Sequence, residues 1–295
     1  MKSLFLTMRP SQWVKNLVVF AALLFSRSLF DARMFYDACL AFLLFCALSG
    51  SIYIINDLVD IEADRRHPRK KHRPLAAGRV SPRTALALAL VVGAGGIACS
   101  FLALGVTFGI VGSAYLLLNL AYTLRLKQIV LLDVLSIAVG FVLRAIAGVE
   151  ALQSTDPDVV LSPWLLVCTL FLSLLLALGK RRHEISLLEA GAGRHRQSLE
   201  EYSVDLLNHL IAMVAGCTAI AYAIYTIWPG TVAKFHTQNL IYTVPFVVYG
   251  LFRYLYLVWH KDEGGNPSEL MMTDFPLALD IVLWLATAGL VLYGL

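Results

Sequence analysis

The chain has 295 residues, of which 59% are hydrophobic and 15% are charged, and its formal net charge is +4. Its mean hydropathy of +0.73 is well above the usual value for a soluble domain of this size. Composition therefore argues against a soluble globular protein and predicts an all-α integral membrane protein.

Nine apolar runs follow one another along the chain. A helix needs about 20 apolar residues to cross the hydrocarbon layer. The runs lie near residues 12–30, 34–57, 84–104, 106–124, 129–150, 162–180, 205–227, 239–259 and 275–294. Lys15 and Asn16 interrupt the first run, which is therefore expected to begin at the membrane interface. It lacks a small-residue cleavage site, so it is not interpreted as a signal peptide. We expect one membrane domain over residues 1–295, with nine transmembrane helices.

The loops between these runs alternate in charge. One set is rich in Lys and Arg, above all in the segment 65–83, whereas the other set contains only Arg27, Arg33 and Lys234. Because basic residues accumulate on the cytoplasmic side, the N-terminus is predicted to be cytoplasmic and the C-terminus external. The protein is expected in the plasma membrane, and its positive charge requires no nucleic acid partner. A homo-oligomer is compatible with the sequence, which does not fix the oligomeric state.

Two further features of the sequence allow predictions. The polar stretch 181–204 is predicted to be a cytoplasmic helical loop with a break at its glycines. Five cysteines stand singly inside apolar runs, which indicates buried thiols rather than disulfides or metal clusters; they are Cys39, Cys46, Cys99, Cys168 and Cys217.

The second apolar run leads directly into a group of acids. If the helix continues, Asn56, Asp60 and Asp64 lie at steps of four residues, and Asp57 lies three residues before Asp60, so all four share one face. Carboxylates repel one another there, and the helix dipole disfavours anions at a C-terminal end. Two interpretations stay open. The neighbouring cations Arg65, Arg66, Lys70 and Lys71 could neutralise the acids as a solvated loop, or the acids could share Mg²⁺ while the cations hold phosphate oxygens.

The pattern of Asn56, Asp57, Asp60 and Asp64 resembles the first aspartate motif, NDxxDxxxD, of the UbiA superfamily of intramembrane prenyltransferases. The resemblance implies a nine-helix bundle with a central cavity and its active site facing the cytoplasm. It also implies a magnesium site formed by these four residues, with Asp57, Asp60 and Asp64 as catalytic residues that act on a diphosphate leaving group.

The chain departs from that superfamily after its sixth run. Members that use prenyl diphosphates carry a second aspartate motif there, whereas this chain reads LALGKRRHEISLLEA, with Lys180, Arg181 and Arg182 and a single nearby acid, Glu184. Exchanging carboxylates for cations suits a more anionic substrate, such as phosphoribosyl diphosphate (PRPP). The segments 9–16, 122–148, 162–182 and 245–258 likewise resemble the polyprenyl-phosphate 5-phosphoribosyltransferase branch. That resemblance implies Mg²⁺-dependent transfer from PRPP to a polyprenyl phosphate, which yields a lipid-linked pentose precursor for arabinan in cell envelopes.

Further ligand candidates come from charge and spacing. The fourth run carries a polar stripe formed by Tyr115, Asn119, Tyr122 and Arg125. Packing of its tyrosines between helices is as good an explanation as a substrate-binding wall. Inside the fifth run, Asp133 and Arg144 are expected to find partners on other spans. Lys180 and Glu184 could simply pair with each other. The complete set of predicted substrate-binding residues is Lys15, Asn56, Lys70, Arg73, Asn119, Tyr122, Arg125, Arg144, Lys180, Arg181 and Glu184.

Two other functions are considered. An aromatic prenyltransferase would share the first aspartate motif, and the missing second motif counts against it. A lipid transporter would also explain the spans and the intramembrane charges, but such proteins often show internal repeats, and none is evident here. The scattered histidines offer no convincing general base.

Overall fold

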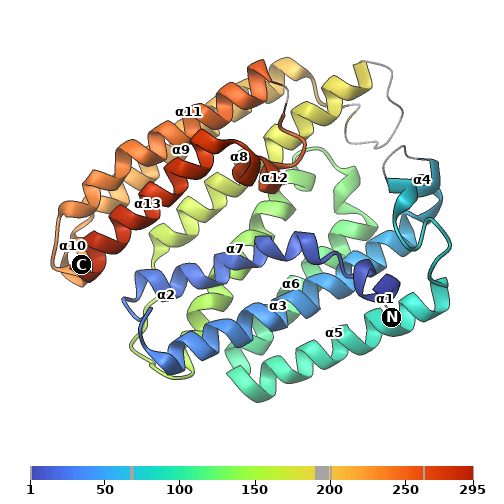
Figure 1. Cartoon of the computed structure of the whole chain (residues 1–295), viewed down its shortest axis with the longest axis horizontal. Coiled ribbons are helices and arrows are strands. Elements are labelled where there is room, and N and C mark those ends of the chain that lie inside the picture. The colour runs from blue at the N-terminus through green and yellow to red at the C-terminus, as the bar shows by residue number, and fades with distance from the viewer. Residues whose placement is uncertain (1, 67–69, 190–198, 200, 262, 295) are drawn as a thin grey trace. The chain divides into compact units, whose positions relative to one another are not determined.

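The chain folds into helices throughout the part that the structure describes. A computed structural model describes residues 2–66, 70–189, 199, 201–261 and 263–294. All regular elements in these ranges are helices, which confirms the all-α prediction (Figure 1). The glycine break predicted within 181–204 falls on residues outside the described ranges, whereas 181–189 continue a membrane helix.

Eight helices among the described residues are long and apolar enough to cross a membrane. Seven are continuous α-helices, and in the eighth the short 3₁₀ helix η5 (Asn239–Thr243) leads into α11. They are α3 (Ala32–Val59), α5 (Pro82–Leu104), α6 (Val106–Leu124), α7 (Leu132–Gln153), α8 (Pro163–Glu189), α9 (Val204–Ile227), η5 with α11 (Val244–His260), and α13 (Phe275–Tyr293).

The first predicted span takes a different form. It consists of the 3₁₀ helix η1 (Pro10–Phe20) followed by the short helix α2 (Ala21–Phe25). Because a 3₁₀ helix rises about 2.0 Å per residue and an α-helix about 1.5 Å, the two elements together measure roughly 30 Å, which is close to the hydrocarbon thickness. The nine predicted spans are therefore eight long helices and one mixed segment.

Local signals set the helix boundaries. Asp31 caps α3 by accepting hydrogen bonds from the backbone N–H groups of Arg33 and Met34, both at 2.9 Å. Ser81 caps α5, whose first residue is proline. Gly105, with φ of 92°, separates α5 from α6, a backbone conformation that other residues rarely adopt.

The remaining elements are short connections. They are α1 (Lys2–Thr7), α4 (Ile61–Arg66), η2 (Lys70–His72), η3 (Leu126–Gln128), α10 (Pro229–Phe235) and α12 (Pro267–Thr273). All five cysteines are free, but only Cys46 is buried, whereas Cys99 is exposed and the other three are half-buried. The prediction of buried thiols is therefore wrong for four of the five, because their faces of the spans are not packed inside the protein.

The chain divides into two compact units, which are described separately. Unit 1 comprises residues 1–136 and 140–161, and unit 2 comprises 137–139 and 162–295. In unit 1, α3 packs against α5, α6 and η1. Its core includes Phe45, Leu48, Phe108 and Tyr115, with the Phe45 and Phe108 rings 6.0 Å apart. In unit 2, α8 packs against α9, and α11 packs against α9 and α13.

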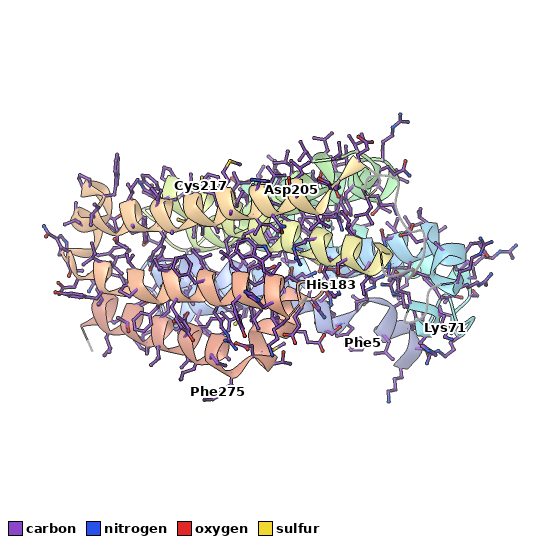
Figure 2. All side chains as sticks on the ribbon, turned by 90° about the horizontal axis from the view of Figure 1, so that it is seen from above. Phe5, Lys71, His183, Asp205, Cys217 and Phe275 are labelled. Carbon is purple, nitrogen blue, oxygen red and sulfur yellow. The ribbon has the colours of Figure 1, made fainter. Side chains whose placement is uncertain are left out.

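Both units are apolar outside as well as inside. Leu102 and Ile110 are exposed on unit 1, and Phe252 and Val282 are exposed on unit 2. Helices with apolar residues all round are typical of a lipid environment. Charged side chains gather instead at helix ends, for example Lys71, beside α4 at one end of unit 1 (Figure 2).

Candidate functional site

The acidic end of α3 is bent at Asp60. The helix ends at Val59, and Asp60 has φ of −96° and ψ of 10° before α4 begins at Ile61. The prediction that one continuous helix runs through all the acids is therefore wrong. Carboxylates are unfavourable at the negative end of a helix dipole, which weakens the helix at this point. The turn spacing is kept, because Asp60 N–H donates to Asn56 O at 3.0 Å and Asp64 N–H donates to Asp60 O at 2.8 Å.

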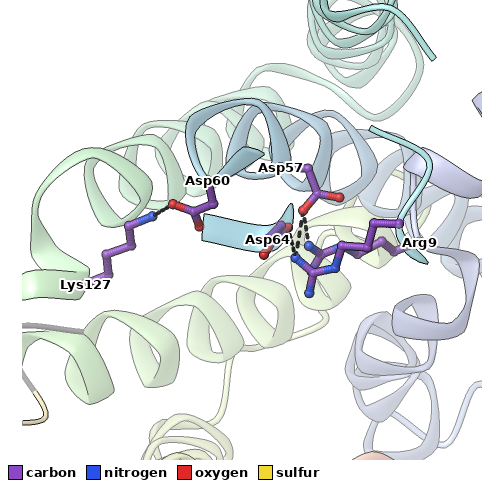
Figure 3. Close-up of polar contacts among 6 residues, drawn as sticks. Arg9, Asp57, Asp60, Asp64 and Lys127 are labelled. Carbon is purple, nitrogen blue, oxygen red and sulfur yellow. Dashed lines mark hydrogen bonds and ion pairs between the residues drawn. The ribbon is translucent and has the colours of Figure 1, made fainter. Parts of the chain in front are cut away.

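Asp57 and Asp64 are bridged by one guanidinium. Arg73 Nη1 donates to Asp57 Oδ1 at 3.2 Å and to Asp64 Oδ2 at 2.5 Å (Figure 3). Arg9, which precedes η1, also pairs with Asp57. Both carboxylates are buried, with 2% and 3% of the respective residues exposed. Two aspartates thus share a cation at the end of α3.

Asp60 points to a different cation. Lys127 Nζ, on η3 between α6 and α7, donates to Asp60 Oδ1 at 2.7 Å (Figure 3). Lys127 is only 8% exposed, so the pair is shielded on the lysine side. Each of the three aspartates therefore has a cationic partner within unit 1.

These partners are not the ones that the solvated-loop interpretation requires. Arg65 pairs with Glu62 at 2.7 Å, on the exposed side of α4. Among the described ion pairs, the cations that contact the aspartates come from before η1, from after η2 and from η3. Sequence reasoning did not assign Arg9 and Lys127 to the site, although Arg9 opens the segment 9–16 and Lys127 follows the polar stripe of α6.

A second group of polar residues surrounds Arg144 on α7. Its Nε donates to Asn16 Oδ1 at 2.8 Å, its Nη2 to the Tyr115 hydroxyl at 2.7 Å and its Nη1 to Gly140 O at 3.0 Å. Asn16 in turn donates to Ser49 Oγ at 3.2 Å. The prediction that Arg144 finds partners on other spans is confirmed. Asp133, which is fully buried at the start of α7, accepts a hydrogen bond from Val134 N–H at 2.9 Å.

The other predicted residues of unit 1 occupy different environments. Asn119 donates to Tyr115 O at 2.8 Å along α6, and the partly buried Tyr122 lies about one turn further on. Arg125 is exposed and ends α6. Lys15 is partly buried on η1, close enough to Arg9 and Arg144 for their charges to repel one another. Asn56 and Lys70 are also partly buried, the first at the end of α3 and the second on η2.

The basic segment of α8 belongs to unit 2. Arg181 is 1% exposed and its Nη1 donates to Glu184 Oε2 at 2.6 Å, whereas Lys180 Nζ lies 4.0 Å from Glu184 Oε1. Arg181 is therefore the closer partner of Glu184. Arg182 has a structural role, because it donates to Asn208 Oδ1 at 2.9 Å and to Val258 O at 2.7 Å, which ties α8 to α9 and α11.

The carboxylates of unit 1 suit a magnesium ion that is shared with a substrate. No group of three His, Cys, Asp or Glu side chains among the described residues could hold a metal by itself. Asp57 and Asp64, however, present oxygens on either side of one Arg73 nitrogen. Mg²⁺ is commonly held by one or two carboxylates together with substrate phosphates and water. The donor set fits that mode rather than a closed protein cage.

Comparison with known proteins agrees with the sequence and the fold. The UbiA prenyltransferase family matches residues 17–273. A decaprenyl-phosphate phosphoribosyltransferase from Corynebacterium glutamicum is 35% identical, over 97% of this chain and 85% of that protein. The Mycolicibacterium smegmatis protein of the same name is 33% identical, over 97% of this chain and 91% of its own. A solved UbiA homologue from Archaeoglobus fulgidus bound to GPP and Mg²⁺ matches with a TM-score of 0.73 and 17% identity, over 99% of each chain.

Proposed function

Because the chain belongs to the UbiA prenyltransferase family, we propose that it transfers the 5-phosphoribosyl group of PRPP to a polyprenyl phosphate and releases diphosphate. The observation that carries this proposal is the likeness, over 97% of the chain, to relatives named decaprenyl-phosphate phosphoribosyltransferase. The contacts at the end of α3 support it, since they combine carboxylates with several cations.

The aspartates would hold the metal. Asp57, Asp60 and Asp64, with Asn56 beside them, supply the oxygen ligands that Mg²⁺ prefers. When bound, the ion supplies Lewis-acid stabilisation of the negative charge on the leaving diphosphate. The proposal that Mg²⁺ is the cofactor rests on this donor set and on the ion named for the Archaeoglobus fulgidus homologue.

The cations would hold the phosphates. Arg9, Arg73 and Lys127 each reach a carboxylate of this group, so a diphosphate bound there would lie within their reach. Arginine can bind two phosphate oxygens at once, whereas lysine acts as a point charge. These three side chains are therefore proposed to orient the diphosphate and to neutralise part of its charge.

The reaction needs no proton transfer from the protein. The bond between ribose C1 and the diphosphate oxygen breaks with its electron pair passing to diphosphate, and an oxygen of the lipid phosphate forms the new bond to C1. A phosphate monoester is largely ionised at neutral pH, since its second pKa is about 6. The acceptor is already a nucleophile, in keeping with the absence of a convincing histidine base in the sequence.

The assay that tests the proposal uses purified protein in detergent with Mg²⁺, ribose-labelled PRPP and a polyprenyl phosphate. Label should enter the organic phase with release of one diphosphate per lipid. If the label stays in water while a prenyl diphosphate is consumed with an aromatic acceptor, the protein is the alternative prenyltransferase. If neither donor is consumed, the transferase assignment fails.

The location and the remaining ligands are also proposals. The basic loops support a site on the cytoplasmic side of the plasma membrane, where PRPP would be supplied. The product would serve as a lipid-linked pentose precursor for arabinan. Lys180, Arg181 and Glu184 remain predicted substrate ligands, based on the basic character of that segment.

A further inference from the structure

Two cations within the spans of unit 1, Lys15 and Arg144, have no carboxylate partner among the described residues. Arg9, Arg73 and Lys127 pair with aspartates, whereas the three hydrogen-bond acceptors of Arg144 are neutral oxygens. Within the described ranges Lys15 makes no hydrogen bond or ion pair. Arg144 is only 5% exposed. A buried charge without a counterion is costly inside a membrane span, which indicates that an anionic ligand completes this group.

The two cations are close together. The charges of Lys15 and Arg144 are near enough to repel each other, and Asn16, the next residue after Lys15, accepts a hydrogen bond from Arg144. Tyr53 on α3 lies near the charges of Arg144 and Arg9, with the Arg9 guanidinium 5.2 Å from its ring centre. In the described part of the chain the Tyr53 hydroxyl has no hydrogen-bond partner. Lys15 and Tyr53 therefore have donors available for a ligand.

The residues of α3 that lie near this group, Tyr53 and Ser49, are separated from the aspartates along the helix. Tyr53 precedes Asp57 by one helical turn, or about 6 Å of rise, towards the middle of the span. Ser49, which accepts a hydrogen bond from Asn16, precedes Asp57 by about 12 Å. The Lys15 and Arg144 group thus lies on the membrane side of the aspartates.

The ligand that matches this group is a phosphate monoester. Such a group carries about −1.5 to −2 charges at neutral pH and has three acceptor oxygens. Two unmatched cations and a tyrosine hydroxyl complement both its charge and its oxygens. A single carboxylate would leave one cation unmatched.

We propose that Lys15 and Arg144, with Tyr53, bind the phosphate of the polyprenyl acceptor. This inference rests on the proposed function, in which the leaving diphosphate lies at the aspartates and the nucleophile approaches C1 from the opposite side. A lipid phosphate can enter from the membrane side, with its chain remaining in the hydrocarbon. The 5-phosphate of PRPP is the other phosphate monoester in the reaction, and the experiment distinguishes the two sources.

Direct binding tests the proposal without requiring turnover. Radiolabelled farnesyl phosphate, farnesol and ribose 5-phosphate are equilibrated with purified protein in detergent. Farnesyl phosphate should bind more tightly than farnesol, and Lys15→Met should weaken its binding by about tenfold, as expected for the loss of a charged hydrogen bond. Ribose 5-phosphate binding should stay unchanged. Lys234→Met is the matched control, since Lys234 is exposed in unit 2 and should bind all three probes like wild type.

Kinetics give a second readout. Lys15→Met should raise KM for polyprenyl phosphate about tenfold, with KM for PRPP unchanged. Lys15→Arg should restore much of the affinity. Tyr115→Phe removes the hydroxyl that accepts a hydrogen bond from Arg144 but keeps the ring, and it should raise KM for polyprenyl phosphate by less than Lys15→Met does. This variant tests the role of Arg144 if Arg144→Met does not fold.

Two outcomes would overturn the proposal. One is a loss of ribose 5-phosphate affinity in Lys15→Met with farnesyl phosphate binding intact, which would assign the group to the donor. The other is unchanged binding of both phosphates. If farnesyl phosphate binds and its binding depends on Lys15, but the wild-type protein transfers no ribose label, the phosphate site is supported and the proposed phosphoribosyl transfer is refuted. The two failures are therefore distinguishable.

Discussion

At the scale of residues, the site depends on ion pairs between distant parts of the chain. Asp60 and Lys127 are 67 residues apart, and Arg9 and Asp57 are 48 residues apart. Local pairing does occur, between Arg65 and Glu62, but it lies on the exposed side of α4. Among the described ion pairs, the aspartates are thus paired with cations from distant parts of the chain. This arrangement makes the role of each pair testable one side chain at a time.

The variant Asp60→Ala should abolish turnover and leave the protein folded. Asp60 is proposed to bind the metal, and its side chain is 30% exposed, so its removal disturbs little packing. The measurements are the transfer assay and the melting temperature in detergent. Glu62→Ala is the matched control, because Glu62 is exposed and pairs only with Arg65 in the described contacts, and it should retain activity. Full activity of Asp60→Ala with added Mg²⁺ would refute the metal assignment.

The variant Lys127→Met should lower kcat/KM for PRPP by at least about tenfold, because it removes a charged contact proposed to reach the diphosphate. Its free energy of unfolding should change by less than about 1 kcal/mol, since Asp60 is partly solvated without its partner. Steady-state kinetics and thermal unfolding measure the two effects. Lys127→Arg should recover part of the activity. A variant that loses stability and activity together would indicate a structural role instead.

At the scale of elements, the approach of α7 to η1 positions the Arg144 group. Gly148 on α7 lies against the backbone of Val19, so closely that a Cβ there would collide with the Val19 carbonyl. The 3₁₀ form of η1 places Asn16 between Arg144 and Ser49. The position of Arg144 thus depends on a glycine contact that carries no charge.

Replacing that glycine tests this dependence. Gly148→Ala should destabilise the protein by about 1–3 kcal/mol, the usual cost of overpacking, and should lower the melting temperature. Gly95→Ala on α5 is the control, because a Cβ there meets no atom within 4 Å and should leave the melting temperature unchanged or slightly raised. Equal melting temperatures for the two variants would contradict the proposed close contact.

The start of α13 gives a pH-dependent prediction. Asp274 caps this helix, and Arg253 donates to its two oxygens at 3.0 and 2.8 Å, which holds the pKa of Asp274 below its ordinary value. Because this pKa is lowered in the folded state, the pair stabilises the fold fully at pH values above the pKa of Asp in the unfolded chain, about 3.9. The stabilisation is lost as the pH falls through the pKa of the folded state.

Asp274→Asn keeps an acceptor for the cap and removes the charge. It should destabilise the protein by less than about 1 kcal/mol at pH 7, because both side chains of the pair remain in contact with solvent, 26% exposed for Arg253 and 12% for Asp274. The difference in free energy of unfolding between the variant and wild type should become smaller below about pH 4. Thermal unfolding in detergent between pH 7 and pH 3 measures it. A difference that is constant over this range would show that the Asp274 charge does not contribute.

At the scale of the whole molecule, the distribution of basic residues over the loops predicts how the chain is oriented in the membrane. Lys71 is exposed beside α4, next to the basic segment that follows the aspartates, whereas Lys234 is exposed on α10 in a loop with few basic residues. Family membership and the helices confirm a multi-pass membrane protein. The positive-inside tendency predicts that these two lysines face opposite sides of the membrane.

Cysteine labelling tests this topology. In a background without the five native cysteines, Lys71→Cys should react with a membrane-impermeant maleimide only after the membrane is opened or inverted. Lys234→Cys should react in intact cells. The reverse pattern would place the aspartates on the outer side and would separate them from a cytoplasmic supply of PRPP.

The sequence by itself determined the fold class, the positions of the long helices and the acidic end of α3, because hydropathy and helical spacing are local properties of the chain. It could not determine the bend at Asp60, the 3₁₀ form of η1 or the pairing of Lys127. Asn16 and Arg144 are separated by 128 residues, and such partners are chosen by how helices pack. The tertiary structure alone decided which described cations pair with the aspartates and that Lys15 and Arg144, within the spans, have no carboxylate partner there, because charges far apart in sequence interact only after folding has brought them together.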